Sequence, residues 1–141
     1  TPREGKTIFS ARNRSQFAYS LYLHDNIQNR MIDSMRRPIE ERVDNLQIPP
    51  VWLDDHRVML YNVNLMIVAD FETDRYEIIR DWQDCKNYEI SSVAPLPNHP
   101  NEILYVLNQF YYDEEGEYRK RHDLVHLDLN TGEENMLLID F

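Results

Sequence analysis

Apolar residues arrive in short runs along the chain, separated by clusters of Asn, Asp, Pro and Gly. Such runs, rich in β-branched, leucine and aromatic side chains, are typical of β-strands. The pattern predicts eleven strands in three groups. The first group comprises 7–11, 17–24 and 30–33; the second comprises 50–53, 58–61, 65–70 and 75–80; the third comprises 90–94, 102–110, 123–129 and 134–139. The first group is one strand short of the other two.

One hairpin recurs in all three groups. In each, an apolar strand ends in an aspartate, a polar turn follows, and a second apolar run returns; the aspartates are Asp25, Asp70 and Asp128. The spacing between successive aspartates is 45 residues (70 minus 25) and then 58 (128 minus 70). Four-stranded propeller blades repeat every 40 to 50 residues or so. The repeat therefore predicts blade-like units.

The predicted fold is all-β and propeller-like, a single domain over 1–141 with about three four-stranded blades. The blade-like groups cover about 7–33, 50–80 and 90–139, and 34–49 is a linker. Propellers have four or more blades, so three would leave apolar faces and a sheet edge exposed. The chain is thus expected to be part of a longer propeller, to be completed by oligomerisation with a copy of itself, or to form an open three-sheet solenoid with capped ends. A β-sandwich is the alternative, because strands of this length and spacing also fit one.

Three connections carry further signals. In the linker, a short helix beginning at Pro38 and an irregular loop are equally compatible with the sequence. Pro95, Pro97 and Pro100 are expected to interrupt the strand ladder and to force an irregular crossing before residue 102. Asp54 and Asp55 are expected to form a tight turn with their own side chains.

The net charge limits the kinds of partner that the chain can bind. The chain has a net charge of −10, which repels nucleic acid phosphates and anionic membrane surfaces. No apolar stretch approaches the roughly 20 residues that cross a bilayer.

The lone Cys85 cannot form an intrachain disulfide, so both reducing and oxidising compartments stay open. The chain begins Thr-Pro-Arg-Glu without a methionine, so a removed leader and excision from a longer protein both stay open.

No catalytic or metal-binding motif is recognised, and no enzyme activity, cofactor or metal is predicted. None of the three glycines flanks a serine, so the glycine-flanked elbow of a serine hydrolase is missing. His122 and His126 have the spacing of two ligands on a helix. On a strand they lie roughly 13 Å apart, too far to share an ion.

The connection between the last two long strands holds an aromatic cluster. Phe110, Tyr111, Tyr112 and Tyr118 surround an acidic turn that is followed by three basic residues. Tyrosines in exposed loops are frequent contact residues. A solvated hairpin tip is the simplest interpretation, and the four aromatic residues are the candidate site for a protein or peptide partner.

Two stretches carry a resemblance to a known class. The segment 50–61, with Trp52 and Asp55, resembles the Trp-Ser-Pro-Asp-Gly turn of TolB-type propeller blades, and 65–79 is similar to their following hairpin, with Asp74 in the glycine position. Leu127-Asp128-Leu129-Asn130-Thr131-Gly132 matches that hairpin fully. The stretch 91–104 resembles the approach to a blade hairpin in the N-terminal propeller of prolyl-oligopeptidase-family serine hydrolases.

That resemblance implies a non-catalytic role. In the family, the propeller covers the active site of a separate hydrolase domain and filters substrates by size. No residue of this chain corresponds to the family's catalytic Ser, Asp or His. The expected function is a substrate-gating propeller segment of such a hydrolase. The alternative is a free-standing, self-associating module that binds a protein or peptide.

Overall fold

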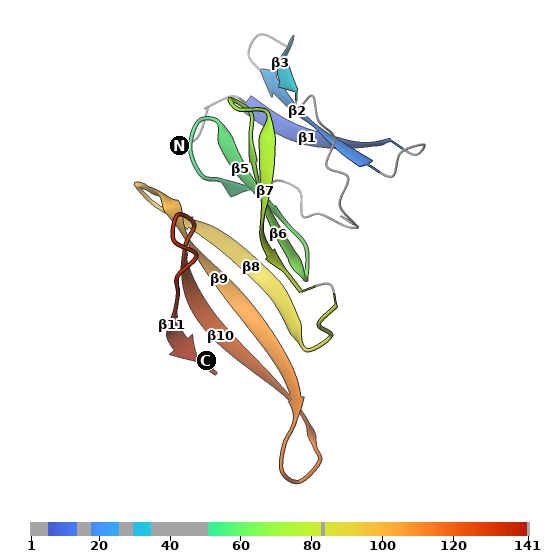
Figure 1. Cartoon of the computed structure of the whole chain (residues 1–141), viewed down its shortest axis with the longest axis vertical. Coiled ribbons are helices and arrows are strands. Elements are labelled where there is room, and N and C mark those ends of the chain that lie inside the picture. The colour runs from blue at the N-terminus through green and yellow to red at the C-terminus, as the bar shows by residue number, and fades with distance from the viewer. Residues whose placement is uncertain (1–5, 14–17, 26–29, 35–50, 83, 141) are drawn as a thin grey trace. The chain divides into compact units, whose positions relative to one another are not determined.

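The computed structural model describes residues 6–13, 18–25, 30–34, 51–82 and 84–140, and side chains from residue 51 onward (Figure 1). All regular elements in these ranges are β-strands, joined in three antiparallel sheets. The first sheet has the order β1-β2-β3, formed by Lys6–Asn13, Ala18–Asp25 and Arg30–Ser34. The all-β prediction is confirmed. Within the described residues the first sheet has three strands, so the prediction that the first group is one strand short is also confirmed.

The second sheet is a meander of four strands. Its order is β4-β5-β6-β7, formed by Val51–Trp52, Arg57–Tyr61, Leu65–Asp70 and Arg75–Asp81. Four of the five residues in the apolar run 65–69 are fully buried, because β6 lies between β5 and β7 and both of its faces are covered. Each large side chain buried in this way contributes about 1.5–3 kcal/mol. The core of this sheet is therefore centred on β6.

The third sheet is the longest and again follows chain order. Its strands are β8 (Tyr88–Leu96), β9 (His99–Tyr112), β10 (Tyr118–Asp128) and β11 (Glu134–Ile139). Alternation decides which face is buried: Ile103, Tyr105, Val125 and Leu127 are almost fully buried, whereas the residues between them are partly exposed. One face of this sheet is therefore the better covered.

The repeated hairpin has the same local structure in the second and third sheets. Asp70 accepts hydrogen bonds from the backbone N–H groups of Glu72 and Thr73 at 2.9 and 3.3 Å. Asp128 accepts the equivalent pair from Asn130 and Thr131 at 2.8 and 3.2 Å. Four residues after each aspartate the backbone is left-handed, with φ 56° at Asp74 and 73° at Gly132. Asp74 thus occupies the conformation that the matching repeat gives to glycine.

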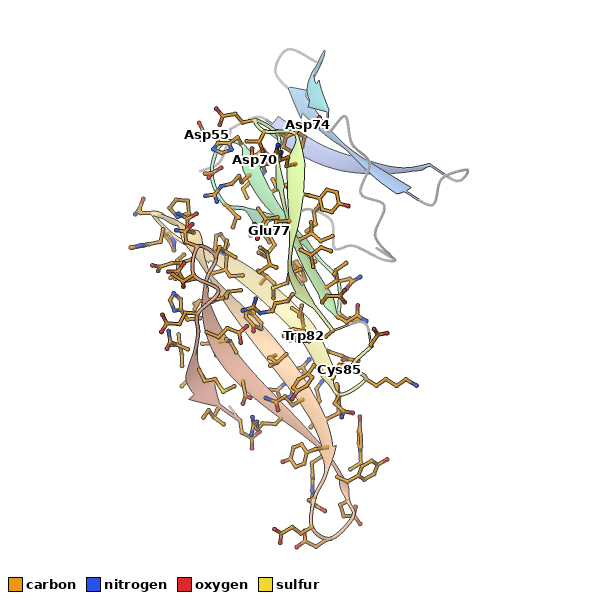
Figure 2. All side chains as sticks on the ribbon, viewed as in Figure 1. Asp55, Asp70, Asp74, Glu77, Trp82 and Cys85 are labelled. Carbon is orange, nitrogen blue, oxygen red and sulfur yellow. The ribbon has the colours of Figure 1, made fainter. Side chains whose placement is uncertain are left out.

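The chain divides into two compact units. One contains residues 1–62 and 67–78, and the other contains 63–66 and 79–141. Within the second unit, Trp82 follows β7 and packs against Tyr105, with the ring centroids 6.3 Å apart. The Tyr105 hydroxyl and the Arg80 guanidinium both donate to Glu134, each at 2.7 Å. Figure 2 labels Trp82 and Cys85 in the connection between β7 and β8.

The prediction at the prolines was partly right. The β8–β9 ladder continues through Pro95, which pairs with Ile103, and then closes in a hairpin where Leu96 pairs with His99. Proline is tolerated here because β8 is an edge strand of its sheet and needs no outward N–H donor. The irregularity is reduced to a register shift between Pro95 and Leu96 and a positive φ of 64° at Asn98. The predicted helix or loop after Pro38 lies outside the described residues.

Candidate functional site

The most prominent feature of the third sheet is a two-stranded extension. Along β9, Gln109 is the last residue paired to β8, and along β10, Asp123 is the last residue paired to β11. Residues 110–121, termed the arm here, therefore have no strand on either side, and Figure 1 shows this hairpin running beyond its neighbours. Two strands alone are marginally stable in water. Side-chain contacts within the arm must therefore stabilise it.

The ring contacts of the arm lie on one of its faces. Phe110 stacks on Tyr118 with ring centroids 5.9 Å apart and planes 10° apart, and Tyr112 meets Tyr118 edge to face at 5.5 Å. Lys120 is the cross-strand partner of Phe110, and its ammonium lies 5.3 Å from that ring centroid. Cross-strand pairs of this kind contribute about 0.2–1 kcal/mol each. We call Phe110, Tyr112, Tyr118 and Lys120 the aromatic face.

Three of the four predicted aromatic residues are therefore brought together, and one is not. Tyr111 is opposite Arg119 in the register and alternates with Phe110 and Tyr112, so its side chain leaves the other face of the arm. On the aromatic face, Tyr112 is 73% exposed and Tyr118 is 60% exposed. These two rings contact each other edge to face and are accessible at the same time.

The turn of the arm is held by Asp113. Its carboxylate accepts the backbone N–H groups of Glu115 and Glu117 at 3.1 and 2.8 Å and the Arg119 guanidinium at 2.6 Å. The bond from Arg119, followed by the bond from Glu117, lowers the pKa of Asp113 below its ordinary value. Gly116 supplies the left-handed residue of the turn, with φ 78°. The acidic turn and the basic strand are thus joined by a specific ion pair between Asp113 and Arg119.

The root of the arm is fixed by a buried carboxylate that the sequence analysis did not single out. Asp123 is fully buried and accepts hydrogen bonds from Gln109 at 2.6 Å, from the Arg121 guanidinium at 2.9 and 3.1 Å, and from the Asp140 backbone N–H at 3.1 Å. A pocket of about 250 Å³ adjoins this network, lined by Asn87, Tyr88, Gln109, Phe110, Tyr111 and Arg121. The cross-strand pairing of Gln109 with Arg121 is the signal that locates it.

A second polar cluster lies at the β4–β5 and β6–β7 turns. Asp54 accepts the backbone N–H groups of His56 and Arg57 at 3.0 and 2.8 Å, which confirms the predicted turn for the Asp54 side chain. His56 Nδ1 bonds to Asp70 at 2.9 Å, and its Nε2 lies 3.5 Å from Glu72. Figure 2 labels Asp70 and Asp74 at the β6–β7 turn and Asp55 in the β4–β5 loop.

The charges and hydrogen bonds around His56 indicate that this second cluster stabilises the two turns. The hydrogen bond to Asp70 raises the pKa of His56, opposed by burial and aided by the charges of Asp54, Asp70 and Glu72. Burial alone would raise the pKa of Asp70, but the bond from His56 and the backbone bonds from Glu72 and Thr73 lower it. Both imidazole nitrogens face carboxylates, so the ring has the surroundings of an ion pair and not of a general base aimed at a nucleophile.

The remaining histidines have separate partners. His122 bonds to Asn108 at 2.6 Å, and His126 contacts Glu102 at 3.4 Å. Among the residues whose side chains are described, no group of three or more His, Cys, Asp or Glu side chains is arranged to hold a metal ion. Over that same part of the chain, no helix has the length and apolar character to cross a bilayer.

Comparison with known proteins adds no relationship. No protein-family model matches the chain, and a search of curated proteins finds no significant match. The function must therefore be inferred from the sheets and the arm.

Proposed function

We propose that this chain is a non-catalytic β-propeller segment of the kind that gates substrate access in prolyl-oligopeptidase-like serine hydrolases. One observation carries the proposal: each sheet is a meander in strict chain order, and the described turns that follow Asp70 and Asp128 close in the same way. Blades are such meanders, whereas sandwiches commonly exchange strands between sheets by Greek-key connections.

The less buried face of the third sheet supports this proposal. The strand registers place four apolar residues next to one another on this face: Leu104, Val106, Leu124 and Leu138. All four are partly or half exposed. An apolar stripe of this kind is expected when a further sheet packs on it, as successive blades do. A solitary sheet that faced water would favour polar residues at these positions.

The test is the gene itself combined with chemical labelling. We expect the reading frame beyond Phe141 to encode a hydrolase domain with a glycine-flanked serine. A fluorophosphonate probe should then label the full-length product and leave the 141-residue chain unlabelled. A frame that encodes no such serine would refute the hydrolase assignment, and labelling of this chain alone would refute its non-catalytic role.

The arm favours a second candidate function, a protein- or peptide-binding module. Its carrying observation is that Tyr112 and Tyr118 remain largely exposed while they contact each other and Tyr118 stacks on Phe110. Pre-organised aromatic rings bind at low entropic cost, because little freedom is lost on contact. Replacing Tyr112 and Tyr118 by Thr should abolish capture of the native partner, and unchanged capture would contradict this function.

A further inference from the structure

The cations of the arm have partners within the chain, whereas two of its carboxylates form no ion pair among the described residues. Each of its cations has an internal partner: Arg119 pairs with Asp113, Lys120 lies on the Phe110 ring, and Arg121 pairs with Asp123. Glu114 and Glu117 are exposed, and among the described residues no ion pair involves either of them. The end of the arm therefore presents negative charge beside two exposed phenol rings.

The arm already contains one example of the contact that such a surface forms. The Lys120 ammonium lies over the Phe110 ring at 5.3 Å, within the range in which a ring attracts a cation. Tyr112 and Tyr118 offer further aromatic surface at 73% and 60% exposure. A cation from another molecule can contact these rings and approach the neighbouring carboxylates together.

Charge complementarity selects among partners. The net charge of −10 and the free carboxylates of the arm repel acidic peptides and nucleic acid. An apolar peptide gains from the rings but leaves Glu114 and Glu117 without a counter-charge. A basic peptide satisfies both features.

We propose that the arm binds a basic peptide segment, with Lys or Arg side chains on Tyr112 and Tyr118 and further cations facing Glu114 and Glu117. This proposal rests on the binding function assigned to the arm above. Tyr111 projects from the other face and has no part in it.

Fluorescence anisotropy tests the proposal. The probes are three labelled peptides of equal length, in which glycine alternates with lysine, glutamate or serine. We expect the lysine peptide to bind most tightly and to weaken between about 50 mM and about 300 mM salt, because the charges are exposed and screened. Replacing both Tyr112 and Tyr118 by Thr should weaken binding about 4- to 25-fold, at about 2- to 5-fold for each ring.

Matched variants separate the arm from general charge attraction. Tyr111→Thr changes a tyrosine on the opposite face and should leave affinity unchanged, whereas Tyr112→Phe with Tyr118→Phe keeps the rings and should retain binding. Glu114→Gln with Glu117→Gln should weaken binding and flatten its salt dependence. Thermal unfolding of each variant establishes that the fold is kept; threonine is chosen because it favours strands.

The outcomes divide clearly. Tight binding of the lysine peptide that depends on Tyr112 and Tyr118 supports the proposal. Equal binding by wild type and the double threonine variant overturns it, as does failure of all three peptides to bind. If the serine or glutamate peptide binds more tightly with the same dependence on Tyr112 and Tyr118, the basic chemistry is wrong and the binding function of the arm stands.

Discussion

Replacing Asp123 by Ala should destabilise the third sheet substantially. The carboxylate is fully buried and joins β9, β10 and the residue that follows β11, through Gln109, Arg121 and the Asp140 N–H. Removing one partner from a buried charged network costs about 3–5 kcal/mol. Arg121 is 34% exposed and can regain water, which places the expected loss near the lower end, at about 3 kcal/mol.

Urea unfolding followed by tryptophan fluorescence measures this loss. A Trp52→Phe background leaves Trp82, which packs against Tyr105 in the same compact unit as Asp123, as the sole tryptophan. In thermal unfolding, about 3 kcal/mol corresponds to a decrease of about 6–12 °C in Tm for a chain of this size. Glu133→Ala is the matched control, because Glu133 is exposed and its removal should change stability by about 0.5 kcal/mol or less. If Asp123→Ala and Glu133→Ala behave alike, the network does not hold the root of the arm.

Three further predictions concern the turns and the edge. Gly132→Ala should lower stability by about 1–2 kcal/mol, because φ is 73° there; no atom obstructs a new Cβ, so the loss comes from backbone strain alone. Gly132→Asp should cost less, because aspartate tolerates a positive φ better than alanine does. Equal unfolding midpoints for wild type and Gly132→Ala would contradict the strain. Because the pKa of His56 is raised in the folded state, the stabilisation by its charged form is complete below about pH 6.5 and is lost as pH rises through the folded-state pKa. The difference in stability between wild type and His56→Gln should therefore be larger at about pH 5.5 than at about pH 8.5. A difference that grows with pH would show that the sign is wrong. On β11, residues 136–139 are 50–63% exposed, and Leu137→Lys should reduce concentration-dependent light scattering; unchanged scattering would exclude this edge as the route of self-association.

The strands could be predicted because their patterns are local. The alternation of 125–128 and the continuous apolar run of 65–69 each indicate a strand without knowledge of its neighbours. The aspartate turns were predictable for the same reason, since Asp54 and Asp128 bond backbone groups two and three residues ahead. Most predicted strand ends lie within two residues of the observed ones, although β9 begins at His99 and not at 102, and β10 begins at Tyr118, within the arm, and not at 123.

The geometry of the arm required strand register, which the sequence does not specify. A shift of one residue would exchange the two faces, and with them the positions of Tyr111 and Tyr112. The buried role of Asp123 also depends on Gln109, which is 14 residues away and adjacent to it through the ladder. Pro95 was misjudged because its harmless position depends on β8 being an edge strand of its sheet.

An experimental structure of the complete protein encoded by the gene would show how the three sheets are arranged. If the chain is a propeller segment, the three meander sheets lie around a common axis, with β4 and β8, the first strands of their sheets, nearest to it. A neighbouring sheet then packs against Leu104, Val106 and Leu124. Two sheets packed face to face as a sandwich, with that apolar stripe open to water, would rule out a propeller.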